Sequence, residues 1–83
     1  MAFRIVYTKT SVRDIKKLDS VAKRKIKKKI EIFSKNPLYY SKRLINAKMG
    51  TYRFRIGNYR VVFDIDKKTI VILRVGHRRE VYK

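Results

Sequence analysis

Cysteine is absent from this 83-residue chain, and its absence excludes disulfide bonds and thiolate metal sites. The chain has one proline and three glycines, so no linker rich in these residues divides it, and no internal repeat is visible. No stretch approaches the roughly 18 consecutive apolar residues of a membrane span, and a strand-like segment follows Met1 where a signal peptide would begin. We therefore expect a single domain over residues 1–83, located in the cytoplasm.

Acidic residues are also scarce. Six Asp and Glu stand against 24 Lys and Arg, which gives a formal net charge of +18. Self-repulsion of this size opposes a compact fold unless a polyanion is near. Hydrophobic residues nevertheless make up 45% of the chain, well above their share in disordered segments. The composition indicates a folded domain with an anionic partner, which is nucleic acid, an acidic protein or a membrane surface.

Apolar periodicity predicts two helices and four strands. Residues 3–7 alternate as a strand, and Ser11 with Asp14 resembles a capping box for a short helix. Asp19 and Ser20 are typical caps for a second helix, which should end before Pro37. Residues 38–50 show no period and are interpreted as a connection, whereas residues 51–56, 59–65 and 70–75 indicate three further strands. We predict an α+β fold of order β-α-α-β-β-β, in which a two-helix hairpin packs on one face of a four-stranded, mostly antiparallel sheet.

A cluster of arginines follows from one predicted turn. If Gly57 and Asn58 form a two-residue hairpin loop, Arg55 lies directly opposite Arg60, and Arg53 lies one pair further along. Like charges in this arrangement destabilise a sheet. We therefore interpret the cluster as a site for an anion, phosphate above all. The alternative is a solvated strand face, and a longer loop would shift the register and separate the arginines.

The second predicted helix carries a dense run of positive charge. Residues 23–29 hold six Lys and Arg in seven positions. Such a run resembles a footprint on an RNA backbone, with a solvated helix surface as the alternative. The predicted RNA-contacting residues are Lys23, Arg24, Lys27 and Lys28 on the helix, and Arg53 on the sheet.

No metal or cofactor site is predicted. Asp64 and Asp66 would point the same way on a strand, an arrangement compatible with a magnesium site. Asp64 is better explained by neighbouring arginines, and Asp66 by a turn. No phosphate-binding loop, zinc-binding helix motif or nucleophile elbow is present.

The order of elements resembles that of the RelE/ParE toxin superfamily over nearly the whole chain. The most specific features are Tyr-Arg-Phe-Arg-Ile at 52–56, Gly-Asn-Tyr-Arg at 57–60 and Gly-His-Arg-Arg-Glu-Val-Tyr at 76–82. This resemblance implies a ribosome-dependent endoribonuclease that cuts mRNA and is held inactive by an acidic, RelB-like antitoxin. It implies contact with mRNA and ribosomal RNA, and it assigns the family's functional positions to Arg53, Arg55, Arg60, Arg78 and Tyr82. Many relatives carry lysine at positions 53 and 55, and the guanidinium groups here are poor proton donors.

The implied reaction is attack of a ribose 2′-OH on the adjacent phosphate, which requires neither water nor a metal. We expect Arg55, Arg60 and Arg78 to hold the phosphate, with Arg53 in support. Either Tyr82 or His77 takes the 2′ proton, because a phenol among arginines has a lowered pKa and a histidine titrates near neutrality.

The sheet face opposite the helices should also carry apolar residues. Val62, Val71 and Leu73 should share the sheet face opposite the helices and offer apolar surface to the antitoxin. One rival is a ParE-like inhibitor of DNA gyrase, against which the retained arginines and terminal tyrosine argue. The other is a non-catalytic module that binds RNA or the ribosome.

Overall fold

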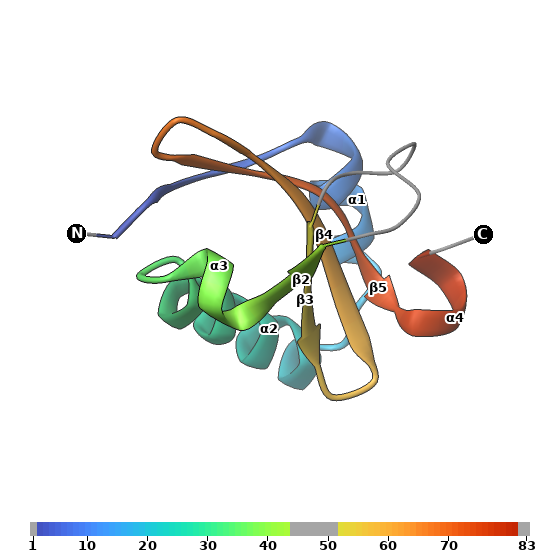
Figure 1. Ribbon diagram of the computed structural model, residues 1–83. Coiled ribbons are helices and arrows are strands. Elements are labelled where there is room, and N and C mark those ends of the chain that lie inside the picture. The colour runs from blue at the N-terminus through green and yellow to red at the C-terminus, as the bar shows by residue number, and fades with distance from the viewer. Residues whose placement is uncertain (1, 44–51, 82–83) are drawn as a thin grey trace.

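The computed structural model describes residues 2–43 and 52–81 (Figure 1). The first half runs through β1 (Arg4–Tyr7), α1 (Lys9–Lys16), α2 (Ser20–Phe33) and α3 (Pro37–Tyr40). The second half runs through β2 (Ser41–Arg43), β3 (Tyr52–Ile56), β4 (Tyr59–Asp66), β5 (Thr69–His77) and α4 (Arg78–Val81). The α+β class and the predicted order of the main helices and strands are confirmed.

The sheet has five strands in the order β1-β5-β4-β3-β2, one more than predicted. β1 pairs with β5 in parallel, and the other three pairings are antiparallel. The additional strand is β2, in which Ser41, Lys42 and Arg43 pair with β3. Three polar residues show no apolar alternation, so this strand is recognisable only through its backbone pairing with β3.

The cap predicted for α1 is wrong. Thr8 is the N-cap residue, and its side chain accepts a hydrogen bond from the backbone N–H of Ser11. Ser11 lies inside the helix, fully buried, and its hydroxyl donates to the carbonyl of Thr8 at 2.8 Å. Asp14 does not complete a capping box, because its carboxylate faces β5 and accepts from the backbone N–H of Val75 at 2.9 Å.

The start predicted for α2 is confirmed. Asp19 is the N-cap, and its carboxylate accepts from the backbone N–H of Ala22 at 2.7 Å. The helix ends at Phe33, before Pro37 as expected. Pro37 then begins the short helix α3, most of which lies in the segment 38–50 that was interpreted as a connection.

One apolar core joins the helices to the sheet. Ile26 and Ile30 of α2 pack against Phe54, Phe63 and other buried strand residues, and Ile15 and Leu18 extend the same cluster from the α1 side. Both long helices therefore lie on one face of the sheet, as predicted. α1 packs chiefly along β5 and α2 beneath β3, and an apolar groove of about 340 Å³ lies between them.

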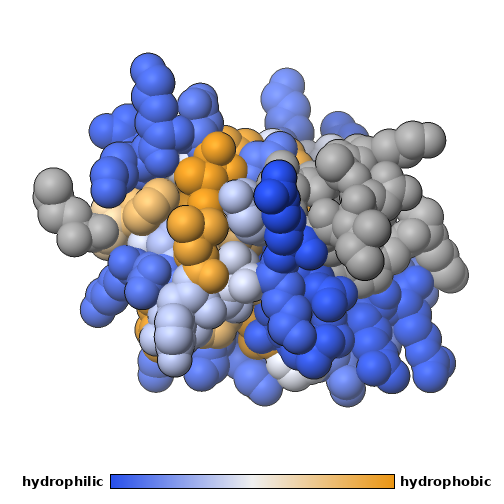
Figure 2. Space-filling model, in the orientation of Figure 1, coloured by the Kyte–Doolittle hydropathy of each residue, from blue (hydrophilic) through white to orange (hydrophobic). Residues whose placement is uncertain are grey.

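Hydrophilic side chains cover most of the outer surface in the view of Figure 2, interrupted by a band of apolar residues. Among residues 2–43 and 52–81, none of the helices combines the length and apolar character needed to cross a membrane.

Candidate functional site

The turn between β3 and β4 determines which side chains meet. Gly57 has a positive φ of 59°, a conformation that glycine adopts without steric cost. The pairing on either side is the predicted one, with Ile56 opposite Tyr59 and Arg55 opposite Arg60. The two-residue loop at 57–58 is confirmed, and with it the register on which the arginine cluster depends.

Strand alternation then separates two faces. Phe54, Ile56 and Val61 point into the core beneath the sheet. Arg53, Arg55 and Arg60 alternate with them and therefore project from the opposite face. The structure thus brings together the three strand arginines that the sequence analysis predicted to be neighbours.

Arg60 is held rigidly within this cluster. Only 5% of the surface of Arg60 is exposed to solvent. Its Nη1 atom donates to the carbonyl oxygens of Gly57 and Tyr59, each at 2.9 Å. A guanidinium fixed on the turn in this way presents a positive charge at a defined position, which favours a preorganised anion site.

The other members of the face are more accessible. Arg55 is exposed and Arg53 is half-buried. Lys42 lies opposite Arg53 in the β2–β3 ladder, so a fourth cation adjoins the face. Lys42 was not among the predicted site residues, because no signal in the sequence alone indicates β2 or pairs residue 42 with residue 53.

The start of α4 is attached to the same turn. The backbone N–H of Arg78 donates to the carbonyl of Asn58 at 2.8 Å. Val81, at the end of α4, is buried, and its Cβ lies 3.9 Å from the position that a Cβ on Gly76 would take. Because Gly76 pairs with Arg60, α4 lies beside the buried arginine. Tyr82 follows Val81 in sequence and lies outside the described residues.

His77 occupies the other face of the sheet. It pairs with Tyr59, and the two rings meet edge to face with centroids 6.1 Å apart. Tyr59 packs against the core beneath the sheet, so the imidazole is directed to the side that carries the helices. Nδ1 of His77 accepts from the backbone N–H of Arg79 at 3.3 Å. The structure does not bring His77 together with the strand arginines.

The cations of α2 also lie on the side that carries the helices. Ala22, Ile26 and Ile30 face the core, while the predicted RNA-contacting residues point outward as exposed or half-buried side chains; these are Lys23, Arg24, Lys27 and Lys28. Nζ of Lys25 lies 3.7 Å from the position of a Cβ on Gly57. The basic helix therefore approaches the β3–β4 turn from the face opposite the arginines.

The apolar residues proposed to contact an antitoxin differ in accessibility. Val62 is fully buried, so a partner can contact it only if surrounding side chains move. Val71 and Leu73 are half-buried. The β4–β5 register shifts between Val62 and Phe63, and Leu73 is the residue left without a partner in the ladder.

Within residues 2–43 and 52–81, His, Asp and Glu side chains do not gather in groups of three or more that could hold a metal ion. Asp64 and Asp66 pair with Val71 and Thr69 along the β4–β5 ladder.

Comparisons with known proteins identify the family. Residues 5–82 match the model of the ParE toxin of type II toxin–antitoxin systems. Toxin RelE3 of Methanocaldococcus jannaschii is 32% identical over 83 aligned positions, and the match covers 95% of this chain and 94% of that protein. Toxin RelG of Mycobacterium tuberculosis is 34% identical over 86 aligned positions, and the match covers 100% of this chain and 99% of that protein.

Solved structures agree with these relatives. The toxin–antitoxin complex RelBE2 of Mycobacterium tuberculosis matches with a TM-score of 0.85 and 33% identity, over 94% of this chain and 100% of that chain. The RelB–RelE antitoxin–toxin complex of Methanococcus jannaschii matches with a TM-score of 0.73 and 31% identity, over 94% and 95% of the two chains. The chain therefore belongs to the RelE/ParE family of toxins from type II toxin–antitoxin systems.

Proposed function

We propose that this toxin is a metal-independent endoribonuclease that acts in the cytoplasm and cleaves mRNA on the ribosome. The observation that supports the proposal most directly is the pairing of Arg55 with Arg60 on the sheet face opposite the helices, with the start of α4 attached to the same turn. Adjacent guanidinium groups repel one another unless an anion lies between them. A phosphodiester satisfies that requirement, since arginine binds phosphate oxygens through two parallel N–H groups.

The reaction balances without an additional reactant. The ribose 2′-oxygen forms a bond to the adjacent phosphorus, and the bond from phosphorus to the 5′-oxygen of the next nucleotide breaks. The products are a 2′,3′-cyclic phosphate and a 5′-OH, whose oxygen takes up one proton for the one that the 2′-OH gives up. Arg55, Arg60 and Arg78 stabilise the negative charge that accumulates on the phosphate oxygens, and Arg53 supports them.

The 2′ proton is assigned to Tyr82. Of the two candidates from the sequence, His77 lies with Tyr59 on the opposite face of the sheet from Arg55 and Arg60. Tyr82 directly follows α4, whose first residue is bonded to the turn of the arginine cluster. A phenol among guanidinium groups ionises more readily than in water, which suits a general base.

Variants of the cluster test the assignment. Arg55→Ala and Tyr82→Phe should each lower cleavage of ribosome-bound mRNA by roughly a hundredfold or more. Arg55 is exposed, so its replacement should leave the melting temperature close to that of the wild type. Arg79→Ala removes a neighbouring exposed charge outside the proposed site and serves as the matched control. Wild-type rates of cleavage in both Arg55→Ala and Tyr82→Phe would eliminate the proposed site.

Two further measurements separate the rival functions. The purified toxin is assayed with mRNA in the presence and absence of ribosomes, and in parallel with DNA gyrase. Cleavage only with ribosomes supports the proposal, whereas inhibition of gyrase without RNA cleavage supports a ParE-like poison. Tight RNA binding with intact strands would identify a non-catalytic module.

An acidic, RelB-like antitoxin is the proposed partner. The matched solved structures include RelB–RelE antitoxin–toxin complexes, and the charge of +18 on this chain favours an acidic protein. Val71 and Leu73 supply apolar surface next to the cationic face. The protein encoded beside this gene should therefore bind at low salt and suppress cleavage.

A further inference from the structure

The turn between β4 and β5 carries an unusual backbone conformation. Lys67 has a positive φ of 56°, and no other non-glycine residue among 2–43 and 52–81 does. In the β3–β4 turn the corresponding first loop position is Gly57, with a φ of 59°. A positive φ at the first of two loop residues matches a type II′ hairpin turn, where glycine is normally found.

Lysine at this position is a poor choice for folding alone. A side chain with a Cβ is strained at positive φ, and glycine or asparagine would adopt it more readily. Strained residues of this kind gather at functional sites, where the side chain is needed despite its backbone cost. The side chain of Lys67 adds a positive charge at this turn.

Two more cations adjoin Lys67. Arg4 of β1 pairs with Thr69 at the start of β5, and its backbone N–H donates to the carbonyl of Lys68 at 2.8 Å. A shallow hollow of about 520 Å³ is lined by Ala2, Arg4, Lys67, Lys68 and Thr69. Nζ of Lys68 lies 5.1 Å from the ring centroid of Phe3, toward the core side.

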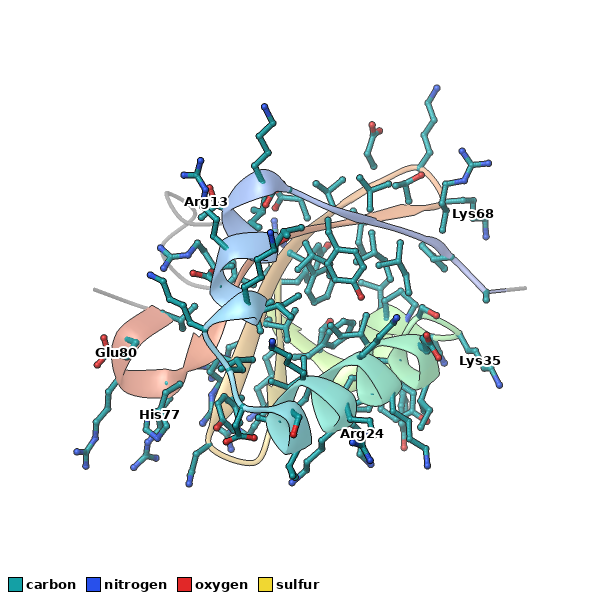
Figure 3. All side chains as sticks on the ribbon, turned by 180° about the vertical axis from the view of Figure 1, so that it is seen from behind. Arg13, Arg24, Lys35, Lys68, His77 and Glu80 are labelled. Carbon is teal, nitrogen blue, oxygen red and sulfur yellow. The ribbon has the colours of Figure 1, made fainter. Side chains whose placement is uncertain are left out.

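This basic hollow lies on the face that carries the arginine cluster. Ile5, Ile65 and Ile70 point to the core, so their neighbours Arg4 and Thr69 project from the opposite face. The hollow and the cluster are at opposite ends of β4, roughly 20 Å apart along the strand. Figure 1 shows the two hairpin turns at opposite ends of the sheet, and Figure 3 shows Lys68 far from His77.

We propose that Arg4, Lys67 and Thr69 bind a phosphate of the RNA strand whose scissile phosphate lies at Arg55 and Arg60. The inference rests on the proposed function. Two cations and a hydroxyl suit the oxygens of a phosphodiester. Asp66, which directly precedes Lys67, is the one acidic residue among positions 66–69, so the net charge of this turn stays positive. RNA is favoured over an acidic protein because the hollow shares its face with the cluster, and an extended strand can reach both. The contact anchors long RNA and adds no base preference.

Lys67→Asn provides a clean test, because asparagine tolerates positive φ and removes the charge. Lys67→Arg keeps the charge at the same position. Lys35→Asn removes the same charge from the exposed turn between α2 and α3, outside the hollow. Binding is measured by fluorescence anisotropy at several salt concentrations, with two 2′-O-methylated RNAs that cannot be cleaved. One is a dinucleotide and the other has about 16 nucleotides.

For the long RNA, Lys67→Asn should raise the Kd several-fold and lower the salt slope by about 1. Its affinity for the dinucleotide should remain that of the wild type, and Lys67→Arg and Lys35→Asn should bind the long RNA normally. Equal behaviour of Lys67→Asn and Lys35→Asn overturns the inference, as does equal weakening of both RNAs by Lys67→Asn. Weaker binding of the acidic partner protein with unchanged RNA affinity would assign the hollow to that partner instead.

The two proposals fail in different ways. If the wild type binds long RNA through Lys67 but leaves unmodified mRNA intact on ribosomes, the proposed nuclease function fails and the anchor stands. If mRNA is cleaved and Lys67→Asn binds like the wild type, the anchor fails and the nuclease function stands.

Discussion

Tyr7 illustrates how its surroundings act on one ionisable side chain. It lines the apolar groove between α1 and α2, with Val12, Ile15 and Ile26 nearby. Burial raises the pKa of its phenol above the usual value, and the negative charge of Glu31 raises it further. The fold therefore favours the neutral phenol.

This shift predicts a pH dependence of stability. A raised pKa contributes stability that is complete below the unfolded value, about 10, and is lost as pH rises through the folded value. Tyr7→Phe should therefore lose less of its unfolding free energy than the wild type between about pH 9 and pH 11. Urea unfolding across this range measures the difference, with Tyr39→Phe at an exposed ring as the control. Parallel curves for wild type and Tyr7→Phe would contradict the assignment.

The position of Arg60 in the sheet could be predicted from the sequence, whereas its burial could not. A two-residue loop at 57–58 and strict strand alternation place Arg60 opposite Arg55, and both features are readable from the sequence. The burial of Arg60 and its bonds to two carbonyl oxygens were not predictable. The two bonds run to carbonyls of the arginine's own turn, and α4, which lies beside Arg60, comes from a segment with no helical period.

At the scale of elements, Asp14 links α1 to β5. Its carboxylate accepts from Nε of Arg74 at 2.8 Å and from the backbone N–H of Val75 at 2.9 Å. The pairing of β1 with β5 ends at Ile72, and Asp14 supplies the hydrogen-bond acceptor for the backbone N–H of Val75 beyond that point. The contact holds α1 against the strand that leads to α4.

Asp14→Asn should loosen this link. An amide of the same shape loses the negative charge and one of the two acceptor oxygens, and its NH2 group then faces a donor of Arg74 or Val75, at a cost of about 1–3 kcal/mol in unfolding free energy. Urea denaturation checks the value. Asp66→Asn, at an exposed turn position, should change stability by less than about 0.5 kcal/mol. If the two variants are equally stable, Asp14 does not join α1 to the sheet as described.

The elements that sequence reasoning found are the long ones with clear periods. β3, β4 and β5 alternate with a period of two, and α2 carries buried residues at helical spacing. The missed elements are α3, β2 and α4, of four, three and four residues. A segment that short contains no full repeat, so its conformation is decided by neighbouring strands and by packing. With β2 unrecognised, Lys42 was absent from the predicted site.

At the scale of the whole molecule, charge opposes folding. A net charge of +18 on 83 residues repels itself across a molecule only 30 Å in its longest dimension. Positive charge borders the groove between the helices, follows α2, and gathers at both ends of the sheet face opposite the helices. The free toxin should therefore be less stable than its core alone would allow.

Salt should stabilise the isolated toxin. Raising sodium chloride from about 0.05 M to 0.5 M shortens the screening length and weakens the repulsion. The melting temperature should then rise by several degrees, which differential scanning calorimetry can measure. A melting temperature that stays constant or falls would show that repulsion among these cations does not limit stability.

The α+β class, the two-residue loop at 57–58 and the shared face of Arg53, Arg55 and Arg60 could all be predicted from the sequence alone, and its net charge favours an anionic partner. These follow from local periodicity, turn chemistry and net charge, which neighbouring residues specify among themselves. Three positions depend on tertiary packing. His77 lies on the face opposite the arginines, Lys42 lies beside Arg53, and Arg4 and Lys67 line one hollow at the far end of the sheet. Those positions arise where segments distant in the chain pack together, because the path of one segment over another is determined by burial and backbone pairing across the whole fold.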